Sequence, residues 1–188
     1  MKSIRRLRIR IVRIGVRLGA GLAVAALMAA CTPALDWREF HADDGAFVVL
    51  MPQRPGQSEK KLVTPAGEVT MKMYSVRVEE TVLGAGYADF AATPDPATQE
   101  AMQAALLRNF AGAIISDKLV AGVAPGMAPG REVVKRGRIG EGTAAVDGEL
   151  RARFYVKGQR YYQLMAAGRQ GALPEADLDM FMASLKPG

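Results

Sequence analysis

The sequence has little of the chemistry on which enzymes and metal sites most often depend. Its 188 residues include a single cysteine, Cys31, and a single histidine, His41. One cysteine cannot form an intrachain disulfide, so the fold must be held together by packing alone. A zinc site needs several His or Cys ligands, and the chain lacks such a set. We therefore expect neither a metal nor another cofactor.

Catalytic signatures are missing as well. No serine lies in a Gly-x-Ser-x-Gly segment, and His41 is the sole imidazole that could serve as a base. The Asp43-Asp44-Gly45 segment lacks the spaced ligands and the closing Glu of a calcium loop. The glycine-rich segment 137–142 precedes a strand pattern, so it offers no helix N-terminus to a phosphate. The sequence predicts no enzyme, although a hydrolase with an unrecognised site stays open.

Positive charge is concentrated at the N-terminus. The chain has 25 basic and 19 acidic residues, and seven of the basic ones precede Cys31. Without that segment the balance is 18 basic against 19 acidic residues, which is close to neutral. Because nucleic-acid binding depends on clustered Lys and Arg, we expect no nucleic-acid partner.

The N-terminal segment has the pattern of an export signal. The basic residues lead into a short apolar stretch, Leu18 to Ala30, which is followed by Cys31. The residues Leu27-Met28-Ala29-Ala30-Cys31 resemble the lipobox of bacterial lipoproteins. That resemblance implies a signal peptide over 1–30, diacylation of Cys31 and a lipidated tether over 31–35. The membrane, reached through this lipid, is then the first expected partner.

Two alternatives to this interpretation stay open. The segment could be an uncleaved anchor helix, or a plain secretory signal that leaves a free thiol. The pair Arg5-Arg6 also leaves the twin-arginine route open beside the general one. Thr32 follows the cysteine, and resemblance to lipoproteins that lack Asp at this position implies the periplasmic side of the outer membrane.

Residues 36–188 are expected to form a single domain with more strand than helix. A helix begins after Asp95, which is a capping residue, with Pro96 in the first turn. A second helix is expected over 174–185, where Leu178, Phe181 and Met182 share a face. Strand patterns lie at 37–40, 46–51, 60–64, 69–78, 81–90, 114–120, 131–138, 145–156 and 160–167. The short connections between the last three strands predict antiparallel pairing.

Several of these segments resemble those of PsbP/Mog-type domains. They are 44–52 followed by Pro55, 129–132, 151–155 with 162–164, and the closing helix that ends at 181–185. The resemblance implies an α+β fold in which an antiparallel sheet lies between helices. Proteins of this type act by binding, although fold alone does not transfer a function.

One strand face is a candidate site for a ligand or partner. Arg151, Arg153 and Tyr155 alternate with apolar residues, which places them on one face. The alternative is that a helix covers this face and that acidic neighbours pair with the arginines. We expect a bulge in the hairpin over 150–167, because a two-residue turn would place Arg153 opposite Leu164. The loop 124–130, with Met127, is either a connector or a contact surface.

Taken together, the sequence predicts a lipid-anchored periplasmic protein that acts as a non-catalytic binding or assembly module of the cell envelope. The expected partner is another envelope protein. An envelope hydrolase and a purely structural lipoprotein are the alternatives.

Overall fold

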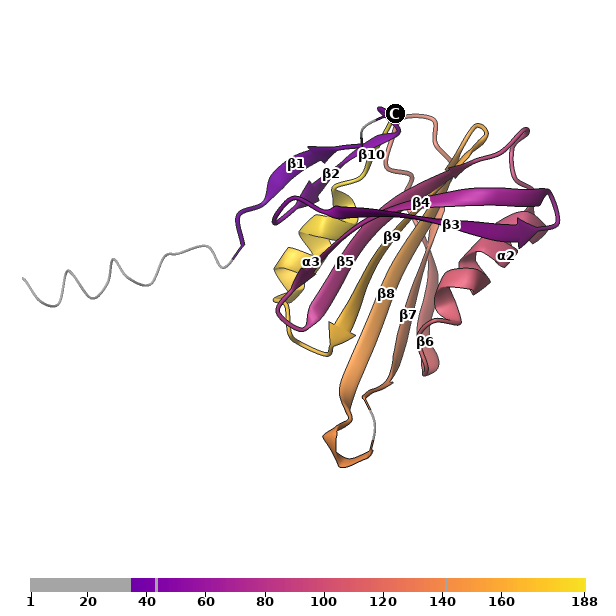
Figure 1. The fold of residues 1–188 in the computed structure, drawn as a ribbon. Coiled ribbons are helices and arrows are strands. Elements are labelled where there is room, and N and C mark those ends of the chain that lie inside the picture. The colour runs from indigo at the N-terminus through magenta and orange to yellow at the C-terminus, as the bar shows by residue number, and fades with distance from the viewer. Residues whose placement is uncertain (1–34, 43, 141) are drawn as a thin grey trace, which may run out of the picture. The chain divides into compact units, whose positions relative to one another are not determined.

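Two antiparallel sheets and two α-helices make up the part of the chain that the computed structural model describes, residues 35–42, 44–140 and 142–188 (Figure 1). The larger sheet has seven strands in the order β3-β4-β5-β9-β8-β7-β6. Their bounds are β3 (Gly56–Thr64), β4 (Gly67–Val78), β5 (Thr81–Asp89), β6 (Ala113–Val120), β7 (Gly130–Ile139), β8 (Val146–Lys157) and β9 (Arg160–Arg169). The smaller sheet has the order β1-β2-β10, with β1 (Arg38–His41), β2 (Phe47–Met51) and β10 (Lys186–Pro187). The helices are α2 (Pro96–Leu107) and α3 (Glu175–Ala183), and η1 (Gly142–Ala144) is a short 3₁₀ turn.

The expected α+β class and antiparallel pairing are confirmed, because every strand pair in the described residues is antiparallel. Turn chemistry explains why neighbouring strands pair. The β3–β4 hairpin turns at Pro65 and Ala66, Gly67 adopts a φ of +105°, and Thr64 donates its hydroxyl to the Gly67 carbonyl at 2.9 Å.

The two helices cover opposite faces of the larger sheet. On β8, Ala152 and Phe154 belong to the buried cluster that contains Met102 of α2. Arg153 lies between them and donates to the carbonyl of Met182 in α3 at 3.0 Å. Since successive residues of a strand point to opposite faces, α2 and α3 lie on different sides of the sheet.

α2 begins where the sequence predicts it. The carboxylate of Asp95 accepts a hydrogen bond from the Thr98 amide at 2.7 Å, and Pro96 is the first helical residue. The other end depends on a distant residue, because the ammonium of Lys135 on β7 donates to the carbonyls of Leu107 and Phe110. This fixes the helix across the sheet.

α3 is shorter than the predicted range 174–185, because Pro174 occupies the N-cap position and Ser184 the C-cap. Its apolar residues are nevertheless buried as expected, with Phe181 and Met182 fully inaccessible to solvent. Phe181 stacks on Trp37 with 6.4 Å between ring centroids, so α3 contacts the residue that directly precedes β1.

The bulge predicted in the β8–β9 hairpin is absent, and that prediction is wrong. The strands join through the two-residue turn Gly158-Gln159, and Arg153 pairs with Leu164. Gly158 has a φ of +58°, as the first central residue of a type II′ turn requires. The mixed pair is tolerated because an arginine can bury its aliphatic stem and still place its guanidinium beside polar groups.

Candidate functional site

Two residues of the predicted face, Arg151 and Arg153, lie against α3. The side chains of Arg151 and Arg153 are only 14% and 18% exposed. Arg151 bonds to Glu175 at 2.6 Å and to Asp179 at 3.1 Å, and both carboxylates belong to α3. An anionic ligand would have to displace α3 and these carboxylates, so the structure agrees with the alternative in which a helix covers this face and acidic neighbours pair with the arginines.

Arg153 is held still more tightly. Its Nε donates to Glu132 at 2.6 Å, and Lys118 lies 3.0 Å from the other oxygen of that carboxylate. The Glu132 side chain is 4% exposed. Burial alone would raise the pKa of Glu132, but the hydrogen bonds from Arg153 and Lys118 outweigh it and hold the pKa below its usual value. The network links three neighbouring strands to α3, which is a structural role.

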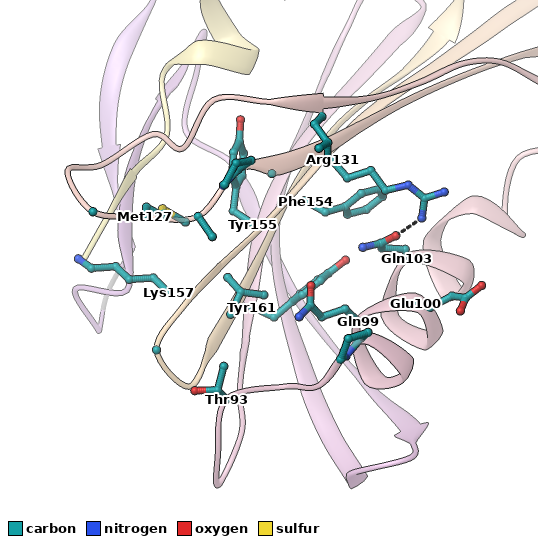
Figure 2. Close-up of a pocket in the computed structure, with 18 of the residues that line it drawn as sticks. Thr93, Gln99, Glu100, Gln103, Met127, Arg131, Phe154, Tyr155, Lys157 and Tyr161 are labelled. Carbon is teal, nitrogen blue, oxygen red and sulfur yellow. Dashed lines mark hydrogen bonds between the residues drawn. The ribbon is translucent and has the colours of Figure 1, made fainter.

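An open cleft of about 730 Å³ lies at the other face, beside the N-terminal half of α2 (Figure 2). α2 forms one wall, the segment 125–131 forms the facing wall, and the ends of β8 and β9 form the floor. Tyr155, the third residue of the predicted face, borders this cleft at the segment 125–131. Its ring packs so closely on Gly130 that a Cβ there would lie 2.4 Å from ring atoms.

The facing wall has a defined conformation. Pro125 and Gly126 occupy the centre of a tight turn, closed by the bond from the Met127 amide to the Ala124 carbonyl at 3.1 Å. Gly126 has a φ of +72°, which is the geometry of a type II turn with Pro first and Gly second. The turn sets the half-buried Met127 side chain at the cleft. Of the two alternatives for this loop, its position at the cleft favours a contact surface.

Polar side chains from the two walls, Gln103 of α2 and Arg131 of the segment 125–131, contact each other. Gln103 is buried, and its side-chain oxygen accepts a hydrogen bond from Arg131. Arg131 also makes a two-pronged bond to Asp117, with distances of 2.9 and 2.6 Å. This pairing lowers the pKa of Asp117 and raises that of Arg131. The charge of Arg131 is therefore already neutralised by Asp117.

Tyr161 contributes a buried hydroxyl without a partner. The residue is inaccessible to solvent, it lines the cleft, and its oxygen makes no hydrogen bond to any described residue. Figure 2 shows the hydroxyl end of the ring directed toward the side on which Gln103 and Arg131 lie. Burial raises the pKa of Tyr161 well above its usual value, so the phenol keeps its proton. The hydroxyl lies beneath the cleft surface, so it belongs to the core under the cleft and is not displayed to a ligand.

Sequence reasoning found one side of this site and missed the other. The loop with Met127 was identified, whereas Gln99, Gln103 and Tyr161 were not. The sequence does contain a signal for the α2 side of the cleft. Gln99 and Gln103 lie four residues apart, and Gln103 falls beside the apolar stripe of α2.

The remaining predicted site residues lie elsewhere. Cys31 is outside the described residues. His41 is exposed on β1, with Glu39 at 3.8 Å as its charged neighbour. In the described ranges, no group of three His, Cys, Asp or Glu side chains is arranged to hold a metal ion. Neither described helix is long and apolar enough to cross a membrane.

Comparison with known proteins assigns no family. No family model matches the chain, and no curated protein matches it. A solved structure from Bacteroides thetaiotaomicron VPI-5482 is similar, with a TM-score of 0.47 and 11% sequence identity. The match covers 80% of this chain and 48% of that one, so this chain spans about half the length of that protein. The function is therefore argued from the cleft.

Proposed function

We propose that this protein is a non-catalytic binding module of the bacterial cell envelope and that the cleft beside α2 is its ligand site. The observation that carries the proposal is the open cleft of about 730 Å³, whose lining includes the exposed Leu119 and the side-chain amide of Gln103, which has no hydrogen-bond partner among the described residues. Ligand sites are concave and mostly apolar, and a few polar groups fix the orientation of the ligand. This cleft has the same combination of features.

The envelope location belongs to the same proposal and rests on the sequence. The lipobox-like segment that ends at Cys31 supports a diacylated protein on the periplasmic side, and Thr32 supports the outer membrane. The two or three acyl chains of a bacterial lipoprotein would anchor it stably, whereas one chain binds only marginally.

The finer fold assignment is likewise a proposal. Helices on opposite faces of an antiparallel sheet agree with an α/β/α sandwich of the PsbP/Mog type. Proteins with PsbP/Mog-type domains act by binding, which agrees with a binding role here. An envelope hydrolase finds less support, because no described serine hydroxyl hydrogen-bonds to His41.

A photoreactive residue tests the site in the full chain. Replacing Met127 by benzoylphenylalanine places the crosslinker on the cleft wall, and irradiation of intact cells should give a discrete higher-mass adduct. Val63 is the matched control, because it is 85% exposed on β3 and lines no part of the cleft. Equal adducts from both positions, or no adduct from position 127, would contradict the proposal.

A further inference from the structure

The strand β6 leaves one edge of the larger sheet open. The sheet ends at β3 on one side and at β6 on the other (Figure 1). Among the described strands β6 pairs with β7 alone, and six of its eight residues are exposed. An unpaired edge presents a row of backbone N–H and C=O groups, onto which a further strand can add.

The other strand edges in the described ranges have features that oppose such pairing, whereas β6 is apolar. Natural sheets protect their edges with charged side chains or keep the edge strands short. β3 has three charged residues in a row at 59–61, and β1 and β10 have four and two residues. β6 instead exposes three large apolar side chains, with Ile114 at 51%, Ile115 at 49% and Leu119 at 77%.

The two charged residues of β6 are compensated from within the same sheet. Asp117 accepts two hydrogen bonds from Arg131, at 2.9 and 2.6 Å, and Lys118 lies 3.0 Å from Glu132. Both partners belong to β7. Because these charges are already paired inside the protomer, the apolar side chains decide which strand matches the edge.

The sequence of β6 matches a second copy of itself in one antiparallel register. A two-fold axis through Asp117 places Ile115 opposite the partner's Leu119, and the symmetry repeats this pair on the other side of the axis. Ser116 then lies opposite the partner's Lys118. An axis through Lys118 would instead place Leu119 opposite the partner's Asp117, which sets an apolar side chain against a charge. The strand is irregular between 114 and 116, so the pairing extends over 115–119.

The two copies of Asp117 face each other at the axis of this register. Like charges directly opposite each other are destabilising. Each carboxylate is, however, bound through both oxygens by Arg131 of its own chain. The centre of the interface is therefore a pair of neutralised ion pairs, flanked on both sides by contacts between isoleucine and leucine.

The same register joins the second copy to the cleft. Leu119 lines the cleft, and it pairs with Arg131, whose guanidinium reaches Gln103 of α2. Directly opposed residues share a face of a sheet, so the partner's Ile115 would lie on the α2 side beside Leu119. It would cover the exposed leucine and extend the apolar wall of the cleft.

We infer that two copies of this chain pair through β6, antiparallel and centred at Asp117, so that their seven-stranded sheets become one and each copy adds Ile115 to the cleft of the other. A second copy fits because the same short strand supplies both partners of the apolar pairs and closes with two-fold symmetry. The inference goes beyond the proposed function and does not depend on what the cleft binds.

Cysteine crosslinking of the full chain tests the register. Intact cells that express Asp117→Cys are treated with copper phenanthroline and analysed on non-reducing gels. Opposed residues of an antiparallel pair lie roughly 4.5–5.5 Å apart between Cα atoms, within the roughly 4.4–6.8 Å of a disulfide. We expect a reducible dimer. Ser116→Cys alone should give much less, because position 116 faces position 118 and its own copy is a diagonal neighbour at roughly 7–8 Å.

A second variant keeps the bonds between Asp117 and Arg131 intact. Ser116→Cys combined with Lys118→Cys should also give the dimer, because these two positions face each other across the axis. Adding Leu119→Lys to this pair should reduce the dimer roughly fivefold, because both contacts between isoleucine and leucine are lost. Val63→Cys is the matched control, since Val63 is 85% exposed on the opposite edge strand and reports random collisions. The wild-type chain, whose one cysteine is Cys31, is the blank.

Three results would overturn the inference. They are no dimer from Asp117→Cys and from the double-cysteine variant, as much dimer from Val63→Cys as from Asp117→Cys, and no effect of Leu119→Lys. The two proposals fail separately. A photocrosslinked adduct at position 127 without a disulfide dimer refutes the second copy and leaves the cleft as a binding site, whereas the reverse outcome refutes the cleft and leaves the pairing through β6.

Discussion

Replacing Arg153 by methionine should lower the free energy of unfolding by about 2–4 kcal/mol, because the substitution strands a buried carboxylate. Methionine keeps much of the aliphatic stem and removes only the charge and its hydrogen bonds. The bonds lost are the one to Glu132 at 2.6 Å and the one to the Met182 carbonyl at 3.0 Å.

The expected loss of stability follows from the buried charge of Glu132 that the substitution leaves behind. Removing one partner of a buried ion pair typically costs about 3–5 kcal/mol, since the other charge is left without compensation. Glu132 is 4% exposed, so water cannot replace the guanidinium. Lys118 still reaches the carboxylate at 3.0 Å, and this second cation reduces the expected loss.

Urea unfolding at neutral pH measures the loss, and two further variants show whether its cause is correct. Lys118→Met should cost less than about 1 kcal/mol, because the lysine side chain is 59% exposed. The double variant Arg153→Met with Glu132→Met should cost less than Arg153→Met alone, because it leaves no orphaned charge. A single-variant loss below about 0.5 kcal/mol, as expected of surface changes, would refute the reasoning.

Acid should weaken the same network. The pKa of Glu132 is lower in the folded protein than in the unfolded chain, so the network contributes fully above the unfolded value of about 4.3. The contribution is then lost as the pH falls through the folded pKa. Acid unfolding curves should show this loss in the wild-type protein and a smaller one in Arg153→Met.

Two other predictions concern the anchor and the core. Cys31→Ala should release the protein from the membrane fraction into the soluble periplasmic fraction, and an unmodified thiol in the mass spectrum of the wild-type membrane protein would contradict lipidation. Residues 36–188, expressed alone, should fold, because they cluster as one compact unit, and Phe181→Ala should cost that fragment about 3–5 kcal/mol in urea unfolding. A loss below about 1 kcal/mol would show that α3 does not pack as described.

The elements that sequence analysis located well are those with local signals. Asp95 and Pro96 mark the start of α2 because capping involves only neighbouring residues. The β3–β4 hairpin is similar, since Pro65 and Gly67 specify its turn within four positions. Alternation of apolar residues then identifies the strands, although their ends shift by a few residues.

The β8–β9 register was mispredicted because its decisive contacts are distant. The pattern alone argued against placing Arg153 opposite Leu164, and it favoured a bulge. Glu132 is 21 residues from Arg153 and Met182 is 29, so neither partner is visible in the hairpin. Glu132 and the Met182 carbonyl bind the guanidinium, so Arg153 can lie opposite Leu164 without an unpaired buried charge. The two-residue turn at Gly158 then needs no bulge.

The cleft could be predicted only in part, for a related reason. It joins the start of α2, the turn at Pro125 and Gly126, and the β8–β9 hairpin, which are brought together by the sheet order. Gln103 carries the informative signal. A glutamine at a buried helical position needs a partner, and Arg131 satisfies only its oxygen. The free amide that remains is a property of the folded site. This unpaired amide, rather than any sequence motif, is what distinguishes the cleft from a simple surface hollow.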